Sequence, residues 1–395
     1  MSATDDSRVS ATGDVWDVAV IGAGPAGATA ARVAAAAGRK VILLERFGLP
    51  RYKTCGGGLI DRSVRAVPPE VRLPVRARAA ALTFTLHGHL GRTRKAPGPV
   101  INLVHRDEFD AALVAAAVAA GAVVRDSTVV TRLAEQQDIV CVYTREHGVI
   151  KARTVVGADG TAGRCAGYVG VQYEQVDLGL ELEIPVPPEQ RDAWEDRVLI
   201  DWGRIPGSYG WVFPKGDQLS VGVITAKGSG EQARGYLDDF LSRLSLSHVQ
   251  PTVSSGHLTR CRTDDAPLYR GRVLVAGDAA GLLDPWSREG ISFALRSGAM
   301  AGRAAAGASQ AGTGDEVARV LTGYADTVSS TLGPEMQAGR AFMKAFKRHP
   351  RAFHLALILL PYAWNLFASV ISGRMSVASV TRRRSARFLL AVLSA

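Results

Sequence analysis

The chain has 395 residues, of which 47% are hydrophobic and 42 are glycine, and its net charge is +10. This length exceeds one ordinary compact core and the composition is not that of a disordered protein, so we expect a globular α/β protein with two interlocked lobes. The four cysteines form no C-x-x-C pair and have no histidine at metal-ligand spacing. This pattern predicts neither a metal site nor a disulfide framework and favours a reducing, cytoplasmic environment.

Residues 1–14 are small and polar and lack the basic start and apolar run of a signal peptide, so we interpret them as a disordered lead-in. A buried strand, Asp17–Ile21, then runs directly into the turn G-A-G-P-A-G and an alanine-rich helix. Gly22 permits the tight turn, Gly24 lets the backbone approach a pyrophosphate, and Gly27 allows the helix to pack close to the sheet. This unit predicts a dinucleotide site, for either NAD or FAD.

Three later strand ends carry acids that would extend this site. The strand Lys40–Leu44 ends on Glu45, which is placed to accept hydrogen bonds from ribose hydroxyls. Two further apolar strands end on Asp159 and Asp278, and a helix follows from about Gly290. An acid more than 200 residues beyond the first glycines suits an extended cofactor with a ribityl chain. The N–H groups at the start of that helix suit the N1–C2=O edge of a flavin, where negative charge collects on reduction.

Together these segments resemble the FAD-binding pattern of the p-hydroxybenzoate hydroxylase superfamily. The resemblance implies that Asp278 binds the ribitol and that Arg106, which opens a helix in H-R-D-E-F-D, belongs to the site. It also implies FAD as cofactor and a Rossmann-like FAD-binding domain joined to an antiparallel-sheet substrate domain. The residues expected to contact FAD are Gly22, Gly24, Ala26, Gly27, Glu45, Arg46, Cys55, Gly56, Gly57, Arg106, Asp159, Gly277, Asp278, Glu289, Gly290 and Ile291.

The stretch R-Y-K-T-C-G-G-G-L follows the ribose-binding acid and contains Cys55. Three glycines after a cysteine form a loop whose backbone can lie flat against a ring system, so we expect Cys55 over or beside the flavin. Lys53 is close enough in sequence to favour the thiolate form of this cysteine. An inert buried thiol is the alternative, and a purely structural cysteine would not need the glycine run.

Residues 206–214, P-G-S-Y-G-W-V-F-P, have an aromatic ring at every second position. This alternation sends Tyr209, Trp211 and Phe213 to one face of a strand, where they fill a core or form the wall of a site. The spacing P-x-x-Y-x-W-x-F-P and the K-x-C-G-G-G loop together resemble the geranylgeranyl reductase family, over roughly residues 15–300.

This second resemblance implies an FAD-dependent reductase that saturates isolated C=C bonds of a polyprenyl chain on a diphosphate, a lipid or a quinone. It gives Cys55 a proton-relay role and implies that the prenyl chain is contacted by Tyr209, Trp211, Phe213 and Pro214. Aromatic walls would keep the site dry and stabilise positive charge developing on the tertiary carbon. A thiol is a weak acid for an alkene, so we expect water to share the proton transfer with Cys55.

The stretch D-P-W-S-R-E-G departs from the family pattern. Its bulky Trp286 and Arg288 are expected beside the flavin, with Trp286 in contact with the substrate, where they would narrow the range of substrates.

Apolar or alternating runs at 177–184, 198–213, 218–224 and 252–262 predict an antiparallel substrate sheet. We therefore assign residues 15–80, 100–175 and 266–330 to the FAD-binding domain, 81–99 and 176–265 to the substrate domain, and 331–395 to a C-terminal helical segment. Glu181 and Glu183 alternate with leucines. A functional role is one interpretation of these acids, but the pattern is more typical of a solvated strand face. The scattered histidines indicate no catalytic cluster.

The positive charge is concentrated from Arg340 onward, around an uncharged segment, Phe353–Ser372. Pro361 and Asn365 interrupt this segment, so we prefer a helical pair that packs on the protein or dips into the lipid interface over a membrane span. The aromatics are mixed with long aliphatic residues, which disfavours nucleic acid as a partner. We expect a cytoplasmic protein, either free or associated with the inner face of the membrane, and a monomer is the simpler expectation.

No second glycine fingerprint is present, so the expected reductant is NADPH that binds transiently or a ferredoxin-like protein attracted by the basic surface. Three alternatives stay open: an FAD-dependent monooxygenase (hydroxylase or epoxidase), a halogenase of the same fold acting on a hydrophobic small molecule, and a flavoprotein that only carries lipid. Against the halogenase motif, Tyr209 stands where tryptophan is expected and Phe213 where isoleucine is expected.

Overall fold

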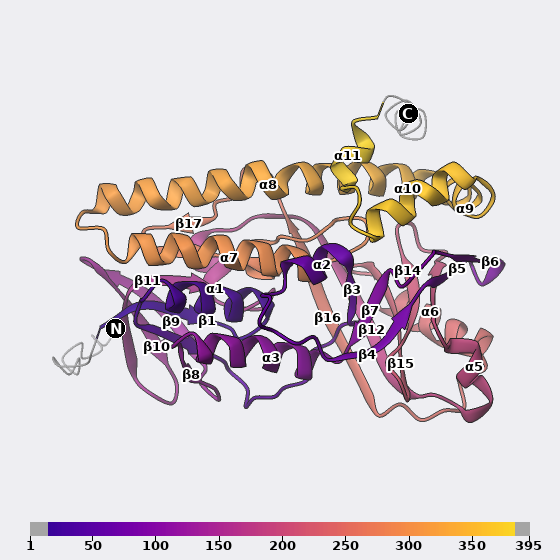
Figure 1. Cartoon of the computed structure of the whole chain (residues 1–395), viewed down its shortest axis with the longest axis horizontal. Coiled ribbons are helices and arrows are strands. Elements are labelled where there is room, and N and C mark those ends of the chain that lie inside the picture. Colours follow the sequence, from indigo (N-terminus) through magenta and orange to yellow (C-terminus); the bar gives the residue numbers. More distant parts are fainter. Residues whose placement is uncertain (1–14, 384–395) are drawn as a thin grey trace.

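An eight-stranded sheet forms the centre of the first lobe (Figure 1). The computed structural model describes residues 15–383, so the expected disordered lead-in lies outside the described residues. The main strand order is β17–β18–β11–β1–β2–β8, and β10 and β9 extend the sheet from β11. The strands are β1 (Trp16–Ile21), β2 (Val41–Leu44), β8 (Val123–Arg125), β9 (Val130–Gln136), β10 (Ile139–Thr144), β11 (Val149–Gly157), β17 (Tyr269–Arg270) and β18 (Val273–Val275). The five strands from β18 to β8 pair in parallel. Burial on both faces explains the continuous apolar runs of β1, β2 and β18.

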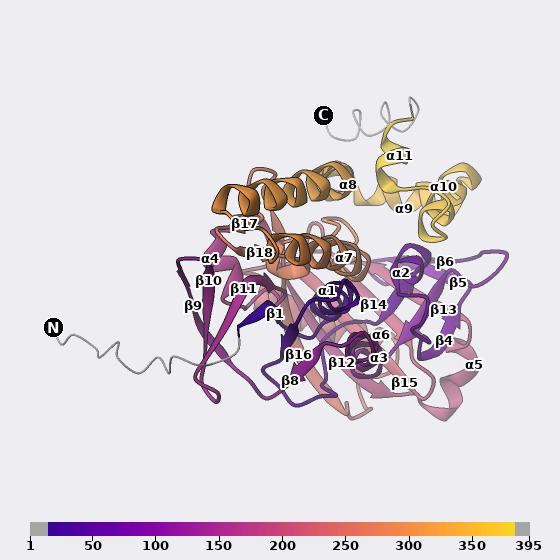
Figure 2. The same ribbon diagram turned by 60° about the vertical axis from the view of Figure 1, so that its left-hand side comes forward.

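Small residues allow the helices of this lobe to pack closely. The helices are α1 (Pro25–Ala36), α3 (Arg106–Ala119) and α7 (Ile291–Ala308). A Cβ on Gly298 of α7 would lie 2.3 Å from the carbonyl oxygen of Ala26, and one on Gly302 would lie 2.5 Å from that of Ala30. The alanine and glycine content of these segments is therefore a packing requirement, because larger side chains would separate α1 from α7. Figure 2 shows α1 between α7 and α3.

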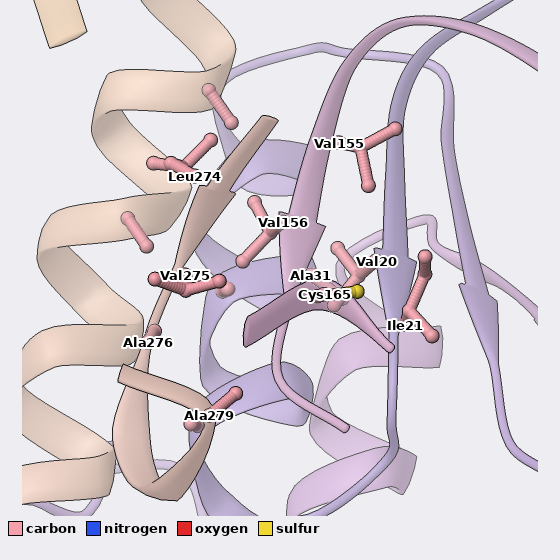
Figure 3. Packing of buried hydrophobic residues seen from close by; sticks show 14 of the residues in the cluster. Val20, Ile21, Ala31, Val155, Val156, Cys165, Leu274, Val275, Ala276 and Ala279 are labelled. Carbon is pink, nitrogen blue, oxygen red and sulfur yellow. The ribbon is translucent and has the colours of Figure 1, made fainter. Parts of the chain in front are cut away.

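The part of the first lobe's core that Figure 3 shows is built from aliphatic side chains. Val155 and Val156 of β11 lie beside Leu274 and Val275 of β18, and all four are completely buried. Cys165 lies in the same cluster with no exposed surface. Burial raises the pKa of the Cys165 thiol, so this cysteine behaves as a small apolar residue of the core.

The second lobe is a seven-stranded sheet in the order β16–β12–β15–β14–β13–β5–β6. All its pairs are antiparallel except β13–β5. The strands are β5 (Ala81–Leu86), β6 (His89–Lys95), β12 (Tyr173–Pro185), β13 (Arg197–Trp202), β14 (Tyr209–Pro214), β15 (Gln218–Ala226) and β16 (Val253–Arg262). Helix α6 (Gly230–Arg243) covers one face of this sheet and buries Leu237 and Phe240 against it. The other face turns toward the first lobe and lines a cavity.

Shorter elements connect the two lobes. A three-stranded sheet, in the order β3–β7–β4, contains the strand that follows the Cys55 loop. Its strands are β3 (Gly58–Ile60), β4 (Val75–Ala79) and β7 (Ile101–Val104). The remaining short helices are α2 (Asp61–Ala66), α4 (Cys165–Val169) and α5 (Arg191–Trp194), with 3-10 turns at Pro188–Gln190 and Gly277–Ala280.

Helix α8 (Gly314–Arg348) runs beside α7 from one lobe toward the other (Figure 1). Its start is fixed by a capping box, in which the Thr313 side chain accepts from the backbone N–H of Glu316 and the Glu316 side chain accepts from that of Thr313. The helices α9 (Pro350–Leu359), α10 (Pro361–Ile371) and α11 (Val377–Thr381) follow at its end. In residues 15–383 no single helix is long and apolar enough to cross a membrane, whereas α9 and α10 pass that test as a pair bent by 93°.

The predicted fold class is confirmed: a Rossmann-like lobe that begins with the strand–glycine turn–helix unit, a mostly antiparallel second sheet and a C-terminal helical segment. The helical pair and the strands of the substrate sheet occur where the sequence indicated them. The proposed boundary between residues 330 and 331, however, falls inside the continuous helix α8. Thr313, which caps α8, marks the start of the C-terminal helices better than the basic and apolar composition on which that boundary was based.

Candidate active site

One cavity of about 770 Å³ lies between the two lobes and joins the glycine turn after β1 to the aromatic face of β14. Most of the predicted site residues line it: Gly22, Gly24, Ala26, Glu45, Arg46, Cys55, Gly56, Gly57, Arg106, Asp159, Tyr209, Trp211, Phe213, Asp278, Trp286, Glu289, Gly290 and Ile291. Three do not, namely Gly27, Pro214 and Gly277. Gly27 packs against the backbone of Gly22, Gly277 packs against Ala26, and Pro214 pairs with Leu219 at the end of β14. These three residues support the lining of the cavity and do not form part of its surface.

The dinucleotide end is built by β1, α1 and β2. Gly22 has a φ of 100°, and a Cβ there would lie 2.3 Å from the carbonyl oxygen of Ala158, so only glycine fits. The N-terminus of α1 has no side-chain cap, and Gly24, Pro25 and Ala26 there line the cavity, so the backbone N–H groups of its first turn are available to an anion. Glu45 is buried and its Oε2 accepts from the backbone N–H of Ala23 at 3.0 Å. This bond fixes the carboxylate at the edge of the cavity.

Arg51 is a residue of this end to which sequence reasoning gave no role. Its Nε lies 3.1 Å from Glu45 Oε2, and its Nη1 lies 3.2 Å from Asp110 Oδ2. A Cβ on Gly24 would be 3.7 Å from its Nη2, so the guanidinium stands over the glycine turn. A cation held there by two acids is placed to contact a pyrophosphate. The spacing of Arg51 after Glu45 carries no general signal, which is why the sequence did not reveal it.

Asp159 and Glu289 both have structural duties that the sequence did not show. Asp159 Oδ2 accepts from the backbone N–H groups of Arg164 and Cys165, at 2.6 and 3.1 Å, and so holds the turn that leads into α4. Glu289 Oε1 accepts from the Ser292 N–H at 2.7 Å and from the Ser63 hydroxyl at 3.0 Å, and so caps α7. Burial raises the pKa of both carboxyls. The second carboxylate oxygen of Asp159 is buried without a hydrogen-bond partner among the described residues, which leaves it available to a ligand.

Asp278 lines the cavity near His257, Lys53 and Arg106. The Nε2 of His257, on β16, is 4.0 Å from Asp278 Oδ2. Burial alone would raise the pKa of Asp278, but His257, Lys53 and Arg106 together hold it below its usual range. Burial and the charge of Arg106 lower the pKa of Lys53 to about 8. Sequence reasoning gave no role to His257, because one histidine on an alternating strand resembles any other.

The Cys55 loop lies against the aromatic strand. A Cβ on Gly56 would come within 2.7 Å of the Phe213 ring and 3.2 Å of the Trp211 Nε1, and one on Gly58 within 3.1 Å of Phe213. The glycines therefore bring the cysteine loop flat against a ring system, but the rings present are those of β14. Gly57 donates its N–H to Cys55 Sγ at 3.4 Å.

Arg106 also interacts with the sulfur of Cys55. Burial would lower the pKa of Arg106, but the charges of Asp110 and Cys55 and their hydrogen bonds to the guanidinium raise it instead. Asp110 holds the guanidinium with two bonds of 2.9 Å. Arg106 is thus a second cation beside the thiol, in addition to Lys53, which the sequence singled out.

The interpretation of Glu181 and Glu183 as a solvated face is wrong. Both are buried, at 1% and 3% exposure, because this face of β12 turns toward the first lobe. Glu183 Oε1 forms an ion pair of 2.6 Å with Lys215, which is itself 2% exposed and also donates to the carbonyl oxygen of Cys55 at 3.3 Å. Glu181 Oε1 accepts from the backbone N–H of Cys55 at 3.0 Å. The leucines of β12 face the α6 side instead, with Leu180 and Leu182 against that core.

The far end of the cavity is aromatic and aliphatic, and its wall comes from β5, β13, β14 and α10. The ring of Phe367, on α10, packs edge to face against the ring of Phe84, with the two ring centroids 5.4 Å apart. The ring of Trp202 stacks on those of Phe84 and Trp286, with centroid distances of 5.9 and 6.3 Å. The Tyr209 hydroxyl donates to the carbonyl oxygen of Ser287 at 2.6 Å, which ties the aromatic strand to the turn that carries Trp286. The C-terminal helices therefore complete the apolar wall.

Comparison with known proteins agrees with this geometry. Residues 15–315 match the model of the family described as "FAD binding domain". The chain is 33% identical over 309 residues to digeranylgeranylglycerophospholipid reductase 1 of Methanopyrus kandleri. The matched region covers 73% of this chain and 80% of that protein. This protein belongs to the geranylgeranyl reductase family. Its structure is similar to that of a geranylgeranyl bacteriochlorophyll reductase-like protein from Thermoplasma acidophilum, with a TM-score of 0.76, 20% identity and coverage of 96% and 99% of the two chains.

A flavin-dependent brominase has the same fold, with a TM-score of 0.71 at 17% identity over 96% of this chain and 98% of the brominase. Identity this low indicates shared architecture alone. The fold is therefore common to both reaction types, and the site residues have to distinguish them.

FAD is the cofactor, and the residues of the cavity fit it. The glycine turn leaves space that a Cβ would fill, Glu45 stands at the ribose position, and an open oxygen of Asp159 faces the cavity. Asp278 lies deeper along the same cavity and close to Gly290, where a Cβ would be 3.4 Å from Asp278 Oδ1. The N-terminus of α7 begins at Ile291 immediately beyond. The glycine turn would hold the pyrophosphate of FAD, Glu45 would hold the ribose, and Asp278 would hold the ribityl chain.

Proposed function

We propose that this protein is an FAD-dependent reductase that saturates isolated C=C bonds in a polyprenyl chain. The observation that carries the proposal is the continuity of one cavity from the dinucleotide turn, past the Cys55 loop, to a wall of aromatic side chains. A long apolar chain fits that wall, and no polar recognition of its middle is required. The relative from Methanopyrus kandleri is named for a geranylgeranyl-bearing phospholipid, which supports a lipid-linked chain as substrate.

The residues of this chain would bind, orient and shield the reacting bond. FAD, when bound and reduced, supplies the hydride. Trp202, Tyr209 and Phe213 would exclude water and hold the alkene in place, and their ring faces would stabilise positive charge on the tertiary carbon. Cys55, fixed by Glu181 and Lys215 through its backbone, would present its thiol as the proton relay.

The test is a reaction with chemically reduced protein under anaerobic conditions. Geranylgeranyl diphosphate, a geranylgeranylated glycerophospholipid and a menaquinone would be added separately, and products followed by mass. Addition of two hydrogens, or a multiple of two, together with flavin reoxidation is the expected result. Oxygen or halide incorporation into an added substrate, without prenyl reduction, would support the monooxygenase or halogenase reading instead. Repeating the reaction with NADPH or with a reduced ferredoxin would identify the electron donor, which we propose to be one of these two.

We further propose that the bent pair α9–α10 contacts the surface of a membrane and so gives the cavity access to a lipid-linked substrate. Four large apolar side chains around the bend are exposed, Leu355 by 43%, Leu359 by 58%, Leu360 by 54% and Tyr362 by 55%. Ten of the 47 lysines and arginines and none of the 37 acids follow Glu335, so the preceding chain is neutral and the whole excess charge lies here. Exposed apolar residues within a basic segment suit an anionic lipid surface. A cytoplasmic protein bound to the inner face of a membrane is the corresponding location.

Vesicle sedimentation tests this contact. The protein should sediment with vesicles rich in phosphatidylglycerol and much less with pure phosphatidylcholine, and the double variant Leu359→Ser/Leu360→Ser should lose most of the binding. Val118→Ser, which changes an exposed apolar residue of α3, is the matched control and should bind as the unmodified protein does. Equal sedimentation of the double variant and the control would contradict the proposal.

A further inference from the structure

The cavity face of β12 carries three acids in alternation, and the middle one differs from its neighbours. Asp177 lies 3.1 Å from Arg288, and Glu183 lies 2.6 Å from Lys215, so both end members form buried ion pairs. Glu181 forms no ion pair within residues 15–383, although it is as buried as the other two. Its cross-strand neighbours, Gly222 and Ser255, carry no charge.

The contacts of Glu181 favour a protonated carboxyl. Oε1 receives the Tyr52 hydroxyl at 2.9 Å and the Cys55 N–H at 3.0 Å, while Oε2 is buried with no hydrogen-bond partner among the described residues. A buried carboxylate with only neutral donors is costly, whereas a protonated carboxyl is not. Burial and the charge of Glu183 raise the pKa of Glu181, and Lys215, Tyr52 and the Cys55 N–H only partly offset them.

Tyr52 connects this carboxyl to the surface. The residue is 43% exposed, yet its hydroxyl reaches Glu181 and also lies 3.2 Å from the Ser255 hydroxyl. A hydroxyl both donates and accepts, so it can pass a proton between water outside and a carboxyl inside. Glu181 lines the cavity, so the path Tyr52–Glu181 leads from solvent to the Cys55 loop.

We propose that Glu181, reloaded from solvent through the Tyr52 hydroxyl, supplies the proton that each prenyl reduction consumes at Cys55. This inference rests on the proposed function. As the C=C π bond breaks, one carbon takes a hydride, which carries both electrons and comes from the reduced cofactor. The other carbon takes the proton of the Cys55 thiol. Neither carboxyl oxygen of Glu181 is hydrogen-bonded to Cys55 Sγ within residues 15–383, so the proton returns to the thiolate across a water molecule in the cavity that both residues line. The resulting carboxylate is reprotonated by solvent through Tyr52. Glu181 acts through Cys55, so it is a positioning and proton-supplying residue.

A thiol-directed reagent tests the coupling without any turnover. Cys55 is only partly buried, while Cys141, Cys165 and Cys261 are buried, so iodoacetamide modification of the FAD-loaded protein reports on Cys55. An ionised Glu181 would disfavour the nearby thiolate and slow modification. The rates for the unmodified protein and Glu181→Gln should therefore agree at low pH, and the variant should become several-fold faster above the pKa of Glu181. The charged and titratable groups that face Glu181, namely Lys215, Glu183 and Tyr52, are retained in Glu181→Gln. Equal rates at every pH would overturn the proposal.

Repeated turnover of a prenyl substrate under an anaerobic excess of dithionite tests the proton supply itself, because Glu181 acts only after Cys55 has given up its own proton. Glu181→Gln keeps the acceptor for the Cys55 N–H but cannot deliver a proton, so we expect a loss of about 100-fold and a flattened pH profile. Tyr52→Phe should lose several-fold with the solvent deuterium isotope effect increased, because reloading becomes slower. Glu231→Gln, an exposed acid of α6, is the control and should react at the unmodified rate.

The outcomes separate this inference from the proposed function. If the unmodified protein reduces prenyl chains and Glu181→Gln matches it in rate and pH profile, the proton path is wrong and the reductase assignment stands. If the unmodified protein reduces none of the prenyl substrates, the assignment fails and the proton path fails with it.

Discussion

The dinucleotide end of the cavity comes mainly from one continuous stretch of chain, residues 16–51, whereas the apolar end is assembled from β5, β13, β14 and α10, with the turn that carries Trp286. At the first end the backbone forms the surface: a glycine turn, a helix N-terminus and one fixed carboxylate. At the second end the surface consists of side chains, packed ring against ring. The cofactor, which a large superfamily shares, would bind the end of the cavity that is formed by backbone. The substrate, which is particular to one family, would bind the end that is formed by side chains, which can differ between proteins of the same fold.

This difference predicts that substitutions can affect the two ends separately. A change in the glycine turn should remove FAD and everything that depends on it. A change in the aromatic wall should leave FAD in place and alter only the handling of the substrate. Cys55 stands between them, since its loop touches Phe213 and Trp211 on one side and Arg106 on the other.

The largest effect is expected for Gly22→Ala. A Cβ there would meet the Ala158 carbonyl oxygen at 2.3 Å, in a left-handed conformation that by itself costs about 1–3 kcal/mol. We expect a protein purified without FAD and therefore without activity, as measured by flavin absorbance per chain and by circular dichroism. Gly38→Ala is the matched control, since Gly38 also has a positive φ of 75° but nothing within 4 Å. It should retain FAD, and a yellow Gly22→Ala protein would show that the turn does not limit cofactor binding.

Cys55 lies between the two ends of the cavity, so Cys55→Ala should slow prenyl reduction without removing FAD. We expect flavin content near that of the unmodified protein and a loss of about 100-fold or more in prenyl reduction, because a positioned proton donor is gone. Anaerobic single-turnover reoxidation of the flavin measures this. Cys141→Ala, in β10 and away from the cavity, should react at the unmodified rate. Unchanged turnover in Cys55→Ala would remove the thiol from the mechanism.

The same division explains which parts of the molecule the sequence could predict. The glycine turn, Glu45 and the alternating rings of β14 are patterns over consecutive residues, and each occurs as expected. Glu181 and Glu183 were misread because alternation identifies the two faces of a strand but not which one meets another lobe. Trp202, Phe367 and His257 reach the cavity through tertiary packing, and nothing adjacent to them in the chain indicates this. Arg51 and Lys215 lie inside or next to recognised motifs, but Asp110 and Glu183, which hold them in place, are more than thirty residues away in sequence.

A smaller effect, confined to the substrate end, is expected for Phe367→Ala. Phe367 lines the cavity and meets Phe84 at 5.4 Å, and loss of part of this contact should weaken substrate binding roughly tenfold. The expected signature is a raised KM for the prenyl substrate with FAD affinity unchanged. Phe353→Ala, in α9, removes a ring that packs on Trp286 and Phe346 but does not line the cavity, so it separates loosening of the helices from loss of the wall. Equal changes in KM for both variants would mean that α10 only supports the site.

The smallest effect concerns Lys53, which stands beside Asp278 and Arg106. Its pKa in the folded protein is about 8, below the ordinary value of 10.5 that it regains on unfolding. Between these values the unfolded chain binds the additional proton, so the free energy of unfolding should rise as the pH increases from about 8 to 10.5, and below pH 8 the burial of the charge is destabilising. Lys53 lines a cavity that water can enter, so the rise should be on the order of 1 kcal/mol. Denaturant unfolding of flavin-free protein at pH 7, 8 and 10 should show it, and Lys53→Met should abolish it. A rise that persists in Lys53→Met would assign the titration to another group and mean that Lys53 keeps its ordinary pKa and its charge in the folded protein.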